Sequence, residues 1–65
     1  MKDEIKNALK LKYEGDIAAA HANIRIYLLN PVGIGEHSDV LSAIDEQVAI
    51  AAAAEEKLKY LEEVK

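Results

Sequence analysis

The 65-residue chain contains no cysteine, no tryptophan and no phenylalanine, and it has one proline and three glycines. Without cysteine it can form no disulfide scaffold, no thiolate zinc site and no thiol nucleophile. Few helix breakers and an apolar content of 51% exclude a linker or an intrinsically disordered segment. The opening residues lack the pattern of a secretory signal, and no charge-free apolar run approaches the roughly 18 residues of a membrane span. We therefore expect a soluble protein that does not enter a membrane.

The length allows one domain at most. A chain this small buries only about 60% of the surface that it exposes when unfolded. Many of its apolar residues are alanines, which contribute little buried area. Such a core gives little margin over the conformational entropy that is lost on folding. Association with further copies is therefore the expected source of stability.

Residues 2–29 are predicted to form one helix, because apolar side chains recur every three or four positions. Gly15 interrupts the pattern, and a glycine inside a helix costs about 1 kcal/mol relative to alanine. The alanine-rich segment after Gly15 favours helix and the pattern keeps its phase, so the sequence predicts a continuous helix. The apolar stripe consists of Ile5, Leu9, Tyr13, Ile17, Ala20, Ile24 and Leu28.

Residues 30–37 are predicted to form a turn, since they hold the only proline and two of the three glycines. A second helix is predicted over residues 38–63, with His37 or Ser38 at its N-cap and Asp39 in its first turn. The apolar stripe of this helix consists of Leu41, Ile44, Val48, Ala51, Leu58 and Leu61, broadened by Val40, Ala43, Ile50 and Ala54.

The short connection predicts an all-α antiparallel two-helix hairpin. Two helices leave half of each broad stripe uncovered, so we expect a dimer of hairpins in a four-helix bundle or a larger helical assembly. Residues 1–35 carry a net charge of +1 and residues 36–65 a net charge of −5, which favours antiparallel docking and helps to set the register between hairpins. The predicted oligomer interface comprises Ile17, Ile24, Leu28, Leu41, Ile44, Val48, Ala51, Leu58 and Leu61.

No constellation of residues predicts catalysis, a cofactor or a metal. Gly33-Ile34-Gly35 lacks the lysine and hydroxyl residue of a phosphate-binding loop, and Glu36 adds negative charge beside it. His21 and His37 are 16 residues apart and cannot form a helical zinc pair. The glutamate pairs at 55–56 and 62–63 adjoin lysines, as on a solvated helix surface. We therefore expect no enzymatic activity.

A cluster of lysines near the start of the chain gives an alternative prediction, an anion- or nucleic-acid-binding regulator that acts as an oligomer. The cluster consists of Lys2, Lys6, Lys10 and Lys12. The chain as a whole has a net charge of −4, and acidic residues are interleaved with these lysines, which argues against nucleic acid as a partner.

The string from Asn30 to Asp39, Asn-Pro-Val-Gly-Ile-Gly-Glu-His-Ser-Asp, resembles a signature of short uncharacterised proteins encoded by marine tailed bacteriophages. The chain is similar to them in length, in its lysine-rich first segment and in its acidic, alanine-rich second helix. Where Ser38 stands, those proteins often have proline, which suits the first helical position. The resemblance implies a phage source and carries no activity or catalytic residue with it.

Together these patterns predict a small non-enzymatic protein that interacts with copies of itself through helix contacts. A host or virion protein is a further candidate partner, and the resemblance implies a location in the host cytoplasm or the virion. The turn is a second predicted contact surface, because a loop of such marked composition can be recognised by a partner. Its residues are Asn30, Pro31, Gly33, Gly35, Glu36 and His37.

Overall fold

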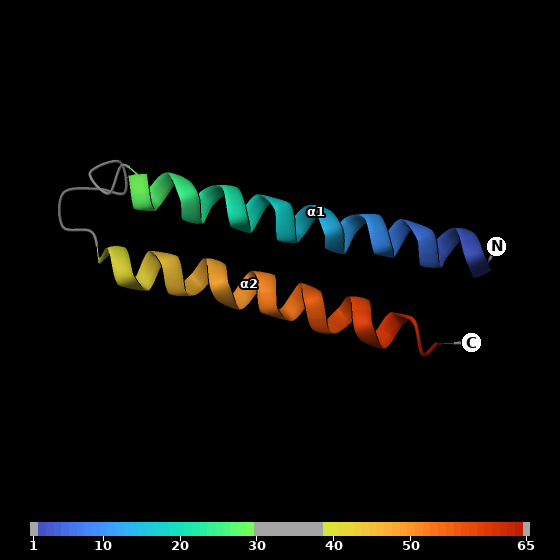
Figure 1. Ribbon diagram of the computed structural model, residues 1–65. Helices are drawn as coiled ribbons and strands as arrows, with labels where there is room; N and C mark the ends of the chain where they lie inside the picture. Colours follow the sequence, from blue (N-terminus) through green and yellow to red (C-terminus); the bar gives the residue numbers. More distant parts are fainter. Residues whose placement is uncertain (1, 30–38, 65) are drawn as a thin grey trace.

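The computed structural model describes residues 2–29 and 39–64, and these residues form two α-helices and no strand. Helix α1 spans Lys2–Leu29 and helix α2 spans Val40–Leu61. The helices lie side by side and antiparallel, so that the start of α1 and the end of α2 meet at one end of a rod measuring 48 × 15 × 14 Å (Figure 1). The predicted all-α helical hairpin is confirmed. The predicted turn residues, 30–37, lie outside the described part of the chain.

Helix α1 continues through Gly15 without interruption. Asp3 and Glu4 occupy its first turn, where negative charge interacts favourably with the helix dipole. The ion pair between Lys12 Nζ and Asp16 Oδ2, at 3.1 Å, bridges one turn across the glycine. A Cβ added at Gly15 would meet no atom within 4 Å, so no close approach requires a glycine there.

Helix α2 begins differently from the prediction. Asp39 is its N-cap and does not lie in the first turn, because its backbone is extended at φ −85° and ψ 91°. Its Oδ1 accepts a 3.1 Å hydrogen bond from the Ser42 backbone N–H, and its Oδ2 accepts one of 2.9 Å from Ser42 Oγ. These bonds favour the ionised carboxylate and lower the pKa of Asp39 below its usual 3.8. His37 and Ser38, the predicted caps, lie outside the described residues.

The end of α2 comes two residues before the predicted position 63. After Leu61 the backbone tightens, since the Glu63 N–H donates to the Tyr60 carbonyl at 2.9 Å and the Val64 N–H to the Leu61 carbonyl at 3.1 Å. Bonds of this i to i+3 type commonly satisfy the last carbonyls of a helix.

The interface between the two helices is built on alanine. Ala20 of α1 and Ala51 and Ala54 of α2 are the buried side chains of the described residues, and no large side chain among them is fully buried. Small side chains let two helix backbones approach closely. Larger side chains flank them half-buried, and these are Leu9, Tyr13, Ile17, Ile24, Tyr27, Val40, Ile44, Leu58 and Leu61.

The inner face of α1 departs from the predicted stripe at both ends. Ile5 and Leu28 are 59% and 65% exposed and do not face α2. Asp16 and Asn23, which the stripe omitted, are half-buried. Asn23 Nδ2 donates a 3.1 Å hydrogen bond to Gln47 Oε1, which pairs the polar members of the two inner faces.

Candidate interaction surface

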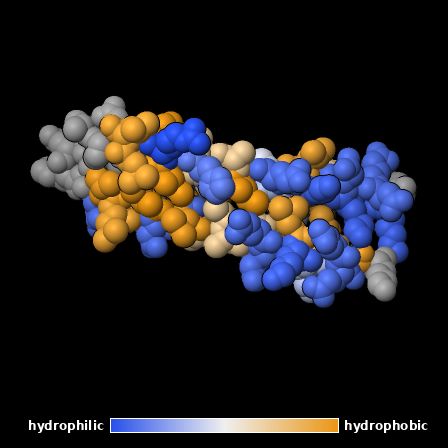
Figure 2. Space-filling view, in the orientation of Figure 1, coloured by the Kyte–Doolittle hydropathy of each residue, from blue (hydrophilic) through white to orange (hydrophobic). Residues whose placement is uncertain are grey.

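An apolar surface covers both helices over the half of the hairpin where α1 ends and α2 begins (Figure 2). Three of its large side chains, Leu28, Leu41 and Val48, are 65%, 80% and 49% exposed. We call this surface the apolar face. Its residues are Ile17, Ile24 and Leu28 of α1 and Leu41, Ile44 and Val48 of α2.

Helix geometry places these six residues on one side of the hairpin. Ile17 precedes the buried Ala20 by three residues, and Val48 precedes the buried Ala51 by three. Each side chain is therefore turned about 60° around its helix axis from the buried alanine, in the same direction when each helix is viewed from its N-terminus. In an antiparallel pair, equal rotations of the same sense point to the same side. Leu28 and Leu41 are rotated by about 80° in that sense by the same calculation. The six side chains therefore form one surface that spans both helices.

A shallow hollow of about 310 Å³ lies on the α1 part of the apolar face. Ile24 and Leu28 form its apolar part, and His21 and Arg25 form its polar edge. Arg25 is exposed and forms no ion pair with another described residue. An apolar hollow with a polar edge resembles the centre and rim of a protein interface.

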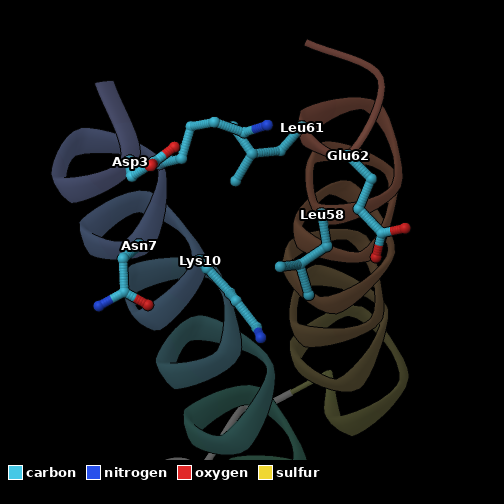
Figure 3. A pocket seen from close by; sticks show the side chains of 7 residues that line it. Asp3, Asn7, Lys10, Leu58, Leu61 and Glu62 are labelled. Carbon is cyan, nitrogen blue, oxygen red and sulfur yellow. The ribbon is translucent and has the colours of Figure 1, made fainter. Parts of the chain in front are cut away.

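The other half of the hairpin is polar on the same side (Figure 2). A hollow of about 520 Å³ lies there between the start of α1 and the end of α2. Leu58 and Lys10 extend into the space between the helices, whereas Asn7 and Glu62 point away from it (Figure 3). The lining combines lysines with Asp3 and Glu62, so its charge is mixed. A mixed lining does not select an anion.

The lysines of the alternative prediction are partly engaged within the chain. Lys6 Nζ donates a 2.6 Å hydrogen bond to the Val64 carbonyl, and Lys12 pairs with Asp16. Lys12 Nζ also lies 5.9 Å from the centre of the Tyr13 ring, and Lys57 Nζ lies 5.5 Å from it. Cations at these distances are attracted to the ring face. Of the four lysines in the cluster, Lys6 and Lys12 are thus engaged within the chain, whereas Lys2 and Lys10 are exposed.

The structure divides the nine residues of the predicted oligomer interface into two groups. Six of them form the apolar face. The other three serve the hairpin itself: Ala51 is buried against α1, and Leu58 and Leu61 are half-buried beside the polar hollow. The predicted turn surface, residues 30–37, lies outside the described residues.

The stripes alone did not indicate the polar residues that matter to the surface. Arg25 and Asp45 are exposed beside the apolar face, whereas Asn23 and Gln47 are paired on the opposite side of the helix interface. The spacing of these residues from Ala20 and Ala51 determines where they lie on each helix. That spacing becomes informative only when it is known which alanines lie at the helix interface.

Within residues 2–29 and 39–64, no group of three or more His, Cys, Asp or Glu side chains could hold a metal ion. Neither α1 nor α2 is long and apolar enough to cross a membrane. Comparison with family models, with curated proteins and with solved structures finds no match to the chain.

Proposed function

We propose that this hairpin is a non-enzymatic protein-interaction module that associates with copies of itself through the apolar face. One observation carries the proposal: large apolar side chains such as Leu28 and Leu41 lie on the outside of this end of the hairpin, while alanines are the only buried side chains among the described residues. Leu28 and Leu41 each expose well over half of their surface. Covering such side chains contributes about 25 cal/mol per Å² of apolar area removed from water.

The shape of the hairpin supports the same conclusion. A two-helix rod has no second layer, and stable helical domains cover each apolar stripe with another element. A pair of hairpins stacked on their apolar faces would provide that layer and form a four-helix bundle. The resemblance to phage proteins, and with it a host or virion protein as a further partner, remains a prediction.

The test is the mass of the protein in solution as a function of concentration, measured by sedimentation equilibrium on the parent and on two variants. Val48→Asp places a charge on the apolar face, where association would bury it without a partner. Ile50→Asp is the matched control, because Ile50 is 46% exposed against 49% for Val48 and lies two residues on, towards the opposite side of α2.

We expect the parent to associate, Val48→Asp to be monomeric and Ile50→Asp to behave as the parent. Circular dichroism on the same samples separates dissociation from unfolding. A parent that remains a helical monomer at every concentration would refute self-association. If Ile50→Asp dissociates and Val48→Asp does not, the interface lies on the opposite side.

A further inference from the structure

We propose that the partner on the apolar face is a second hairpin in parallel orientation, in which the C-terminal ends of the two α1 helices lie together, held in register by Arg25 of each copy against Asp45 of the other. This inference rests on the proposed self-association and specifies its geometry. It is carried by the heights of these two residues along the rod, by their positions on the two helices and by the uneven polarity of the face.

Two contacts between the two halves of the chain show which residues of α1 and α2 lie at the same height along the rod. Asn23 bonds to Gln47 near the middle of the hairpin, and Lys6 bonds to the backbone of Val64 near its end. Both pairs of residue numbers add up to 70, so this relation holds along the rod. Arg25 and Asp45 satisfy it as well, and they therefore lie at one height.

The same two residues lie at the outer edges of the apolar face. Arg25 follows the buried Ala20 by five residues and Asp45 precedes the buried Ala51 by six, which rotates them by about 140° and 120° in the sense of the apolar face. Within one chain they point to opposite edges of the hairpin. Both are exposed, and among the described residues neither forms an ion pair.

A two-fold axis parallel to the helices brings these edges together. It stacks the two apolar faces and sets α1 of each copy against α2 of the other, antiparallel, while every residue keeps its height. Arg25 then lies across from Asp45 of the second copy on one edge of the new interface, and the symmetry repeats the pair on the other edge. Charges at such flanking positions select partner and orientation in helical bundles.

The opposite orientation does not form these charge pairs. A two-fold axis perpendicular to the helices sets α1 against α1 and α2 against α2, so Arg25 of one copy and Asp45 of the other lie at opposite edges of the interface. An axis of this kind through the middle of the rod would also set apolar half against polar half and desolvate charged side chains such as Lys10 and Glu62. In the parallel arrangement, apolar half covers apolar half.

The same geometry limits how far the interface extends. Glu14 and Glu56 also satisfy the height relation and lie at the same edges, so the parallel dimer sets like charges across from each other in its polar half. Contact is thereby confined to the apolar half. Half of a face measuring 48 by 15 Å is roughly 360 Å² per copy, below the about 800 Å² of a standard interface. We therefore expect a reversible, concentration-dependent dimer.

The test exchanges the charges and measures the dimer dissociation constant by sedimentation equilibrium. Arg25→Asp sets Asp against Asp45 twice in the homodimer, and Asp45→Arg sets Arg against Arg25 twice. Each single variant should dissociate about tenfold more readily than the parent. An equimolar mixture of the two should form a heterodimer, because both of its cross-copy pairs are then of opposite charge. The double variant Arg25→Asp/Asp45→Arg should regain the homodimer for the same reason.

Glu46→Arg is the matched control for Asp45→Arg. Glu46 is the adjacent acidic residue, is also exposed and lies about 100° further around α2, on the side away from the apolar face, so the variant makes the same change in net charge away from the proposed pair. It should dimerise like the parent, and its heterodimer with Arg25→Asp should be weaker than that of Asp45→Arg with Arg25→Asp, because only one of its two cross-copy pairs is of opposite charge.

The outcomes separate this inference from the proposed function. Selective pairing of Arg25→Asp with Asp45→Arg supports the parallel register. A parent dimer that persists while Asp45→Arg and Glu46→Arg behave alike overturns the register and leaves self-association intact. A parent that is monomeric throughout overturns both, because it leaves no second copy to be set in register.

Discussion

Asn23 Nδ2 donates a 3.1 Å hydrogen bond to Gln47 Oε1 across the interface of α1 and α2. Among the described residues this is the one hydrogen bond between a side chain of α1 and a side chain of α2, and it is partly buried. Alanines alone would specify the alignment of the helices poorly, because one alanine replaces another at little cost when an alanine-rich segment slides. The amide pair makes one alignment better than its neighbours, as a polar pair in a bundle core does.

The first prediction concerns this amide pair. Asn23→Ala leaves the half-buried amide of Gln47 without its partner and should lower the free energy of unfolding by about 1 kcal/mol, as should Gln47→Ala. The double variant should lose less than the sum, since the second substitution removes the unpaired group. A double-mutant cycle in urea measures the coupling. Strictly additive losses would show that the bond contributes nothing to stability.

The second prediction concerns Gly15. Gly15→Ala should raise the free energy of unfolding by about 0.5–1 kcal/mol, because the position is helical, exposed and open to a Cβ. Ala18→Gly, at another exposed position of α1, should lower it by a similar amount and serves as the converse control. Thermal unfolding followed by circular dichroism measures both. A destabilising Gly15→Ala would show that a Cβ at this position meets a neighbouring group or strains the helix.

The sequence predicted the hairpin correctly because a helical repeat of apolar residues and a cluster of breakers are both local signals. Which face of each helix lies inward is a tertiary property. Leu28 continues the apolar repeat of α1 but is exposed, whereas Asn23 breaks the repeat and is half-buried. Close approach of the helices at Ala20 rotates the inner face toward the small residues, and the larger ones move to the side. The apolar face is a consequence of that rotation.

The cap of α2 illustrates the same limit on a smaller scale. Ser38, Asp39 and His37 all suit the start of a helix, and propensity alone does not choose among them. The choice depends on which side chain reaches a free backbone N–H. Asp39 reaches that of Ser42 and also accepts from its hydroxyl group, which makes it the cap.

The third prediction is a pH dependence from Asp39. Its pKa is lowered below 3.8 in the folded state, mainly by the hydrogen bond from the Ser42 backbone N–H. The folded state therefore favours the ionised form, so this contribution is fully present above the unfolded pKa and is lost as the pH falls through the lower folded value. Asp39→Asn keeps a capping acceptor without a titrating group. Unfolding midpoints of the two proteins should differ at pH 6 and converge near pH 2, and a constant difference would exclude the carboxylate as the cause.

The fourth prediction tests the close approach of the helices within the alanine-rich segment of α2. Ala54 is 3% exposed against α1, whereas its neighbour Ala53 is exposed. Ala54→Leu should force the helices apart and lower the free energy of unfolding by about 1–3 kcal/mol. Ala53→Leu adds the same side chain on the outside and should change stability by less than about 0.5 kcal/mol. Urea denaturation of both variants measures the difference. If Ala54→Leu and Ala53→Leu change stability equally, the buried alanines do not define the helix interface, and the apolar face does not lie where its spacing from them places it.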